Sequence, residues 1–194
     1  MNPSPGTDRL ELEFLYLDVS KCTRCRETDT HLEEALSEVT RLLHTTHRDV
    51  EIRKIHVQSE DQARAVGLVS SPTIRLNGRD IALGGELKES VCESCGGVCG
   101  EEGIGCRVWT YQGQEYTAAP KAMIVDAILR EVYGGSANAE DRPRRSQDLS
   151  ENLKRFFAAK RRAVGQHSGV LRVRHRRPVA STQCRSARRA LTCW

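Results

Sequence analysis

A C-x-x-C motif between a predicted strand and a predicted helix constrains the fold more than any other feature of this chain. Residues 10–17 are a nearly continuous apolar run, which predicts a strand buried on most of both faces inside an α/β sheet. Apolar residues then recur at helical spacing over about 26–45, so one stripe of this helix faces a core. Cys22 and Cys25 therefore lie at a helix start, where unpaired backbone N–H groups and the helix dipole stabilise a thiolate.

A C-x-x-C pair has three readings: half of a zinc site, a structural disulfide or a redox dithiol. Its place between a strand and a helix favours the redox dithiol. Lys21 and Arg24 add positive charge beside the thiols, which also favours a thiolate. We expect Cys22 to be the nucleophile, the more exposed of the two, with a pKa below that of a free cysteine. Cys25 would be the resolving thiol, one turn inside the helix.

Capping, turn and periodicity signals predict the remaining elements. They are a strand over 50–57, a helix from Ser59 to Gly67, strands over 73–76 and 80–83 joined by Asn77-Gly78, a hairpin over 107–117, and a helix from Pro120 to Tyr133. When the cysteine-rich segment and its hairpin (84–119) are set aside, the order is β-α-β-α-β-β-α, with Pro72 in the loop before the third strand.

Four motifs carry a resemblance to a known family. They are Leu15-Tyr16-Leu17-Asp18, Cys22-Thr23-Arg24-Cys25, Ser70-Ser71-Pro72-Thr73-Ile74-Arg75-Leu76-Asn77-Gly78 and Cys106-Arg107-Val108-Trp109. Together they resemble the thioredoxin-like superfamily, and within it a small bacterial and archaeal family of unknown function. The resemblance covers about residues 10–133 and has a weaker echo at 152–157. It implies a thioredoxin-like fold, a thiol chemistry at Cys22 and Cys25, and a cis Pro72 packed against them.

The chain departs from typical thioredoxins in three respects. Lys21 stands where a tryptophan precedes the first cysteine, Thr-Arg replaces Gly-Pro between the cysteines, and a cysteine-rich insertion precedes the last helix. The first two differences alter the redox potential and the docking surface. They therefore argue against a general protein-disulfide reductase.

Cys92, Cys95, Cys99 and Cys106 lie within fifteen residues, among glycines. Four thiolates can close a tetrahedral zinc shell, and glycines let the backbone fold tightly around it. The spacing is irregular for paired knuckles, so disulfides, a second redox relay and free thiols remain alternatives. Soft thiolates also suit copper(I), mercury or arsenite. A glycine-rich segment with few apolar side chains needs such a link to offset its ordering entropy, or it is disordered. We expect the four sulfurs to converge, either in a tetrahedral zinc site or in two disulfides.

Charge divides the chain into two parts. Residues 134–194 hold 15 Lys/Arg and 4 Asp/Glu, whereas residues 1–133 hold 15 Lys/Arg and 22 Asp/Glu. We expect residues 1–9 to be a disordered lead-in, 10–133 to be the domain, and 134–194 to be a basic, largely disordered tail with a short helix at about 150–163. A basic tail binds phosphate backbones non-specifically, and we expect no dedicated nucleic-acid ligand.

Two functions follow from these residues. The first is a cytoplasmic thiol–disulfide oxidoreductase of thioredoxin or glutaredoxin type, acting on a protein or small-molecule disulfide through Cys22, Cys25 and Pro72 without a cofactor. The second is a protein that binds or carries a thiophilic metal or metalloid, using the C-x-x-C and the insertion as ligands. Cytoplasmic location is expected because no apolar run is long enough to span a membrane and no signal pattern opens the chain.

Overall fold

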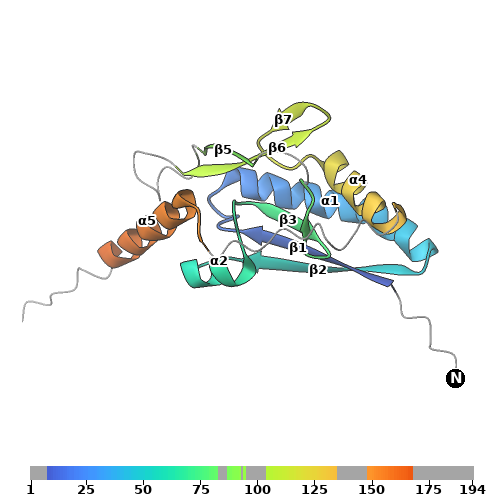
Figure 1. Cartoon of the computed structure of the whole chain (residues 1–194), viewed down its shortest axis with the longest axis horizontal. Helices are drawn as coiled ribbons and strands as arrows, with labels where there is room; N and C mark the ends of the chain where they lie inside the picture. Colours follow the sequence, from blue (N-terminus) through green and yellow to red (C-terminus); the bar gives the residue numbers. More distant parts are fainter. Residues whose placement is uncertain (1–7, 83–86, 93, 95–103, 135–147, 168–194) are drawn as a thin grey trace, which may run out of the picture.

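The computed structural model describes residues 8–82, 87–92, 94, 104–134 and 148–167 (Figure 1). Residues 1–7 of the expected lead-in, the cysteines at 95 and 99, and most of the expected basic tail lie outside these ranges. The other two residues of the expected lead-in, Asp8 and Arg9, are not disordered but begin the first strand. Within them the chain is a mixed α/β structure with two sheets and four helices. No helix in the described part combines the length and apolar character that crossing a membrane requires.

The larger sheet has the strand order β2-β1-β3-β4, with β1 in its interior. The strands are β1 (Asp8–Tyr16), β2 (Arg48–His56), β3 (Thr73–Leu76) and β4 (Arg79–Asp80). β2 runs parallel to β1, and β3 is antiparallel to it. Leu12 and Phe14 point to one core and Leu15 to another, as the alternation of a strand requires. The apolar run in the sequence is therefore buried on both faces.

Helices cover both faces of this sheet. α1 (Thr23–Thr45) and α4 (Lys121–Tyr133) pack together on the face of Leu12 and Phe14. α2 (Glu60–Val66) and α5 (Glu151–His167) lie next to each other on the other side, at one end of the molecule (Figure 1). In the chain, α1 follows β1 and starts shortly beyond the end of this buried strand.

The second sheet contains β5 (Lys88–Val91), β6 (Gly105–Tyr111) and β7 (Gln114–Tyr116), with β6 in the middle. Trp109 of β6 is fully buried in the main core, and the Arg107 guanidinium lies 4.5 Å from the centre of its ring. The Arg107 N–H donates to the Ser71 carbonyl at 2.9 Å. β6 is thereby fixed to the loop that carries Pro72.

Local signals predict most element boundaries well. Ser59 caps α2 through its side chain, and Gly67 ends the helix in the left-handed conformation. Asn77 and Gly78 both have positive φ, as a two-residue hairpin turn demands. The expected strand over 80–83 is wrong at Ile81 and Ala82, which form a turn, and residue 83 lies outside the described residues. The Asp80 carboxylate accepts from Ala82 N–H and from Arg107, and this arrangement closes the turn.

The helix expected near residues 150–163 is α5, and it packs on the sheet rather than standing apart. Its apolar side chains join residues of β1, α2 and the start of β6 in one cluster. The buried members from α5 and the short segment before it are Leu149, Leu153, Phe156 and Phe157. An ion pair of 2.7 Å between Arg161 and Glu60 also joins α5 to α2. This part of the predicted tail belongs to the folded structure.

Candidate metal centre

Asp18 shapes the loop that leads from β1 into α1. Its Oδ1 accepts from the Ser20 N–H at 2.8 Å, the Ser20 hydroxyl at 2.6 Å and the Lys21 N–H at 3.0 Å. Burial opposes ionisation of this carboxyl, but these hydrogen bonds outweigh it, so the pKa of Asp18 lies below its ordinary value. The Cys22 N–H then donates to the Asp18 carbonyl at 3.2 Å. Asp18 thus serves as a turn former that fixes where Cys22 begins the helix.

Cys22 is the N-cap residue of α1. Its Sγ accepts the Cys25 N–H at 3.4 Å, so the sulfur takes the place that a serine or aspartate oxygen usually fills. The sequence predicts Cys22 to be the more exposed of the pair, yet Cys22 is 2% exposed and Cys25 1%. The expected difference is absent because the β5–β6 pair covers the start of α1.

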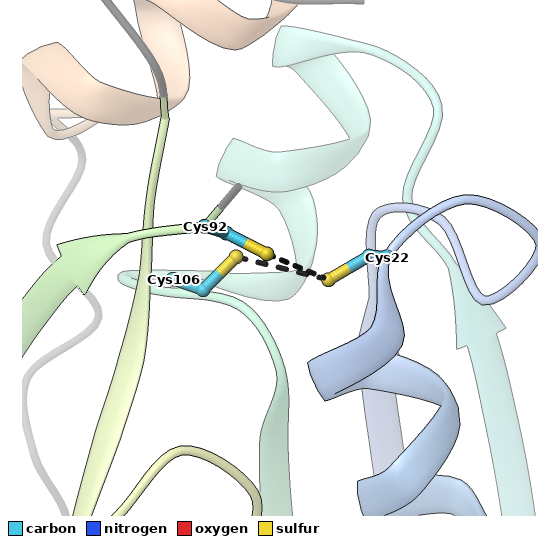
Figure 2. Close-up of side chains that lie close together, drawn as sticks. All are labelled: Cys22, Cys92 and Cys106. Carbon is cyan, nitrogen blue, oxygen red and sulfur yellow. Dashed lines mark hydrogen bonds between the residues drawn. The ribbon is translucent and has the colours of Figure 1, made fainter. Parts of the chain in front are cut away.

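Three cysteine sulfurs meet at this covered helix start. The Cys22 Sγ lies 3.8 Å from the Cys92 Sγ and 3.8 Å from the Cys106 Sγ (Figure 2). All three sulfurs lie within 4.8 Å of one another, and all three residues are buried. We call Cys22, Cys92 and Cys106 the cysteine triad. Disulfide sulfurs lie ~2.05 Å apart, so the three cysteines of the triad are free thiols.

Arg24 holds the second sheet against α1. Its guanidinium donates to the carbonyls of Ser90 at 3.2 Å, Val91 at 2.9 Å and Cys106 at 3.4 Å, and to the Ser90 hydroxyl at 2.8 Å. These groups belong to the paired strands that carry Cys92 and Cys106. Arg24 therefore brings a positive charge and a fork of donors to the point where the two cysteines approach Cys22.

Ser94 links the first turn of α1 to Cys92. Its Oγ accepts the Thr23 N–H at 3.1 Å and lies 3.0 Å from the Cys92 Sγ. Both residues between the cysteines of the motif, Thr23 and Arg24, thus contact the segment that covers the site.

Cys25 lies beside the triad but has a different environment. Its Sγ lies 3.7 Å from the Ser71 hydroxyl, and the Ser71–Pro72 peptide bond is cis, as the sequence resemblance implies. The interaction with the Cys22 sulfur, followed by burial, raises the pKa of the Cys25 thiol well above its ordinary value. Cys25 is therefore a protonated thiol near neutral pH.

The structure distributes the predicted cysteines differently from the sequence analysis. It joins Cys92 and Cys106 of the insertion to Cys22 of the motif, while Cys95 and Cys99 lie outside the described residues. The sequence does not predict a role for Ser94, because a single serine in a glycine-rich segment forms no recognisable motif. Arg24 was predicted to supply charge, and its contacts with the strands could not be predicted because they join residues 66 to 82 positions apart.

The comparisons place this geometry in a family without an assigned activity. No curated protein and no solved structure matches the chain. Residues 10–128 match a family described as a domain of unknown function, and this range includes the whole cysteine triad and Arg24. Because the match covers more than half of the chain, the protein belongs to the family of the domain of unknown function DUF2703.

Proposed function

We propose that this protein binds a thiophilic metal or metalloid ion through the sulfurs of Cys22, Cys92 and Cys106. The observation that carries the proposal is the 3.8 Å separation of Cys22 from each of the other two sulfurs. Ligands of a tetrahedral ion at the Zn–S distance of ~2.3 Å lie about 3.8 Å apart. Two of the three sulfur pairs therefore have the ligand spacing, and the third lies within 4.8 Å.

The chemistry of the donor set narrows the class of ion. Within the described part of the chain the group contains three sulfurs and no carboxylate or imidazole. Sulfur ligands select soft or borderline ions such as zinc, copper(I), mercury(II) or arsenite over magnesium and calcium. Three buried thiolates also repel one another, and the helix start and Arg24 reduce that cost.

The raised pKa of Cys25 supports a site of three sulfurs from these residues. A metal ligand must lose its thiol proton, and the interaction with Cys22, followed by burial, raises the pKa of Cys25 and opposes that loss. Its role beside the ion is to donate to Cys22 and to fill the space under the helix start. Any fourth ligand would come from outside this set.

Cadmium titration of freshly reduced full-length protein tests the proposal, because cadmium–thiolate bonds absorb in the ultraviolet. We expect the wild-type protein to bind cadmium at one tight site. Changing any triad cysteine to serine should lower the cadmium–thiolate absorbance by about a third and the affinity for cadmium more than tenfold. Cys25→Ser is the matched control and should retain both. Wild-type affinity and absorbance in Cys22→Ser, Cys92→Ser or Cys106→Ser would contradict the proposal. A Cys95→Ser/Cys99→Ser variant tests the earlier four-cysteine zinc hypothesis, which predicts loss of the site.

A dithiol oxidoreductase is the second candidate, and the place of Cys22 and Cys25 at the start of α1 favours it. The strand order β2-β1-β3-β4, with Pro72 ahead of β3, supports a thioredoxin-like fold. Cys22 thiolate would attack a disulfide and release one thiolate; Cys25 would then form the Cys22–Cys25 disulfide and release the other. Pro72 would contact the substrate. A Cys25→Ser protein should then accumulate a mixed disulfide with oxidised glutathione, detectable by mass; its absence at Cys22 argues against this activity.

A further inference from the structure

Asn152, the second residue of α5, makes two hydrogen bonds to the backbone of Gly105, the residue before Cys106. The Gly105 N–H donates to the Asn152 Oδ1 at 2.9 Å, and the Asn152 Nδ2 donates to the Gly105 carbonyl at 2.6 Å. Asn152 is 9% exposed, so both bonds form largely out of water. The amide therefore satisfies both backbone polar groups of a single residue, as a neighbouring strand would.

Gly105 lies close to the backbone of both Cys92 and Cys106. It is the first residue of β6 and directly precedes Cys106, and it pairs with Val91 of β5, which directly precedes Cys92. The Cys92 N–H donates to the carbonyl of Ile104, the residue before Gly105. Fixing the backbone at Gly105 thus fixes both cysteine backbones together.

Packing around Gly105 restricts how far it can shift. A Cβ placed on Gly105 would lie 3.1 Å from the Glu89 Cβ and 3.3 Å from the Asn152 Nδ2. Ile104 packs in one cluster with Leu153 and Phe157 of α5. Figure 2 shows the start of β6, which leads into Cys106, close to a helix of the C-terminal segment.

We propose that Asn152 is a positioning residue of the cysteine triad: it holds Gly105, and through it Cys92 and Cys106, at the distance from Cys22 that an ion requires. This inference rests on the proposed function. Ligand groups must stay within about 0.5 Å of their working geometry, and residues behind metal ligands typically contribute 10–100-fold to affinity. The family match ends at residue 128, so this contact comes from a segment beyond it.

The test compares Asn152→Ala and Asn152→Asp with two control variants in the full chain. Asn152→Asp keeps the acceptor for the Gly105 N–H and loses the donor, so it covers the case in which the alanine variant folds poorly. Ser150→Ala and Arg161→Ala are the controls. Ser150 accepts the Leu153 N–H at the start of α5 and contacts Val69, and Arg161 contacts Glu60, so both changes affect α5 without removing a contact to β6. The probe is the cadmium ion alone.

Two readouts separate positioning from general stability. We expect Asn152→Ala to bind cadmium at least 10-fold more weakly, with lower thiolate absorbance per bound ion, and Asn152→Asp to lie between it and the wild type. In metal-free protein, iodoacetamide should alkylate Cys106 several-fold faster in Asn152→Ala, with Cys25 unchanged. The control variants should stay within about twofold of wild type in both readouts.

Each contrary result has a separate meaning. Cadmium affinity and Cys106 alkylation in Asn152→Ala that equal those of the wild type, or of Ser150→Ala, overturn the positioning role and leave the proposed function standing. Absence of cadmium binding by the wild-type protein overturns the proposed function, and with it the role of Asn152 at an ion site. Faster alkylation of Cys106 and Cys25 alike indicates loosening of the whole fold and also overturns the inference.

Discussion

At the scale of single residues, Cys22 is the sulfur on which both candidate chemistries depend. It lies 3.8 Å from two cysteines of the second sheet and shares the motif with Cys25. Ion binding and disulfide formation would therefore compete for one sulfur. A bound ion should protect Cys22 from oxidation, because a coordinated thiolate is not available to attack a disulfide.

Arg24 provides the first prediction at this scale. Arg24→Lys keeps the positive charge, but its single ammonium group cannot reach all three carbonyls. Arg24→Gln loses both the charge and the guanidinium hydrogen bonds to these carbonyls. We expect cadmium affinity to fall about 10-fold in Arg24→Lys and further in Arg24→Gln, as measured by competition with a chelator.

Arg26→Gln is the matched control for Arg24, because Arg26 is exposed on the same first turn of α1. It should bind cadmium like the wild type. If Arg24→Lys binds as well as the wild type, the contribution of Arg24 is its charge alone. If Arg24→Gln matches Arg26→Gln, Arg24 has no role at the site.

At the scale of elements, the β5–β6 pair is the part of the structure that turns a C-x-x-C motif into a covered site. It supplies two of the three sulfurs and hides Cys22 from solvent. It is held from two sides, by Arg24 of α1 and by Asn152 of α5. The position of this strand pair therefore decides whether the three sulfurs can share an ion.

Two glycines of this sheet give a matched prediction. Gly105→Ala places its Cβ 3.1 Å from the Glu89 Cβ, so the strands must shift, and we expect cadmium affinity to fall several-fold. Gly113→Ala meets nothing within 4 Å but has a φ of +78°. It should lower the free energy of unfolding by about 1–2 kcal/mol in urea titrations and leave cadmium affinity unchanged. The prediction fails if the two variants lose affinity equally.

At the scale of the whole molecule, α5 closes the second core and supports the site from behind. Leu153, Phe156 and Phe157 are buried against residues from β1, α2 and the start of β6. Fully burying such side chains contributes about 1.5–3 kcal/mol each. Both the stability of the domain and the geometry of the site therefore depend on α5.

Truncation tests this dependence. A chain that ends after Tyr133 loses α5, and we expect its melting temperature to fall by roughly 10 °C or more, together with its cadmium affinity. A chain that ends after His167 keeps every described contact of α5 and serves as the control. Equal melting temperatures for the two chains would show that α5 adds nothing to the fold.

The elements themselves could be predicted from the sequence because their signals lie within a few residues. The apolar run of β1, the cap at Ser59, the turn at Asn77-Gly78 and the helix start at Cys22 each depend on local backbone and side-chain chemistry. The strand prediction failed at Ile81 because the Asp80 carboxylate closes a turn by accepting the Ala82 N–H, and the distant Arg107 also donates to this carboxylate.

The cysteine partners were decided only by the tertiary structure. The spacing of the cysteines predicts that Cys92 and Cys106 share a site with the cysteines at 95 and 99. The folded protein instead brings Cys92 and Cys106 to Cys22, which is 70 and 84 residues away in the chain. The backbone around a glycine-rich segment has no strong local preference, so distant contacts from Arg24 and Asn152 fix its place. The sequence by itself determined which thiols exist and where α1 begins; packing of the second sheet on α1 and α5 decided which sulfurs meet.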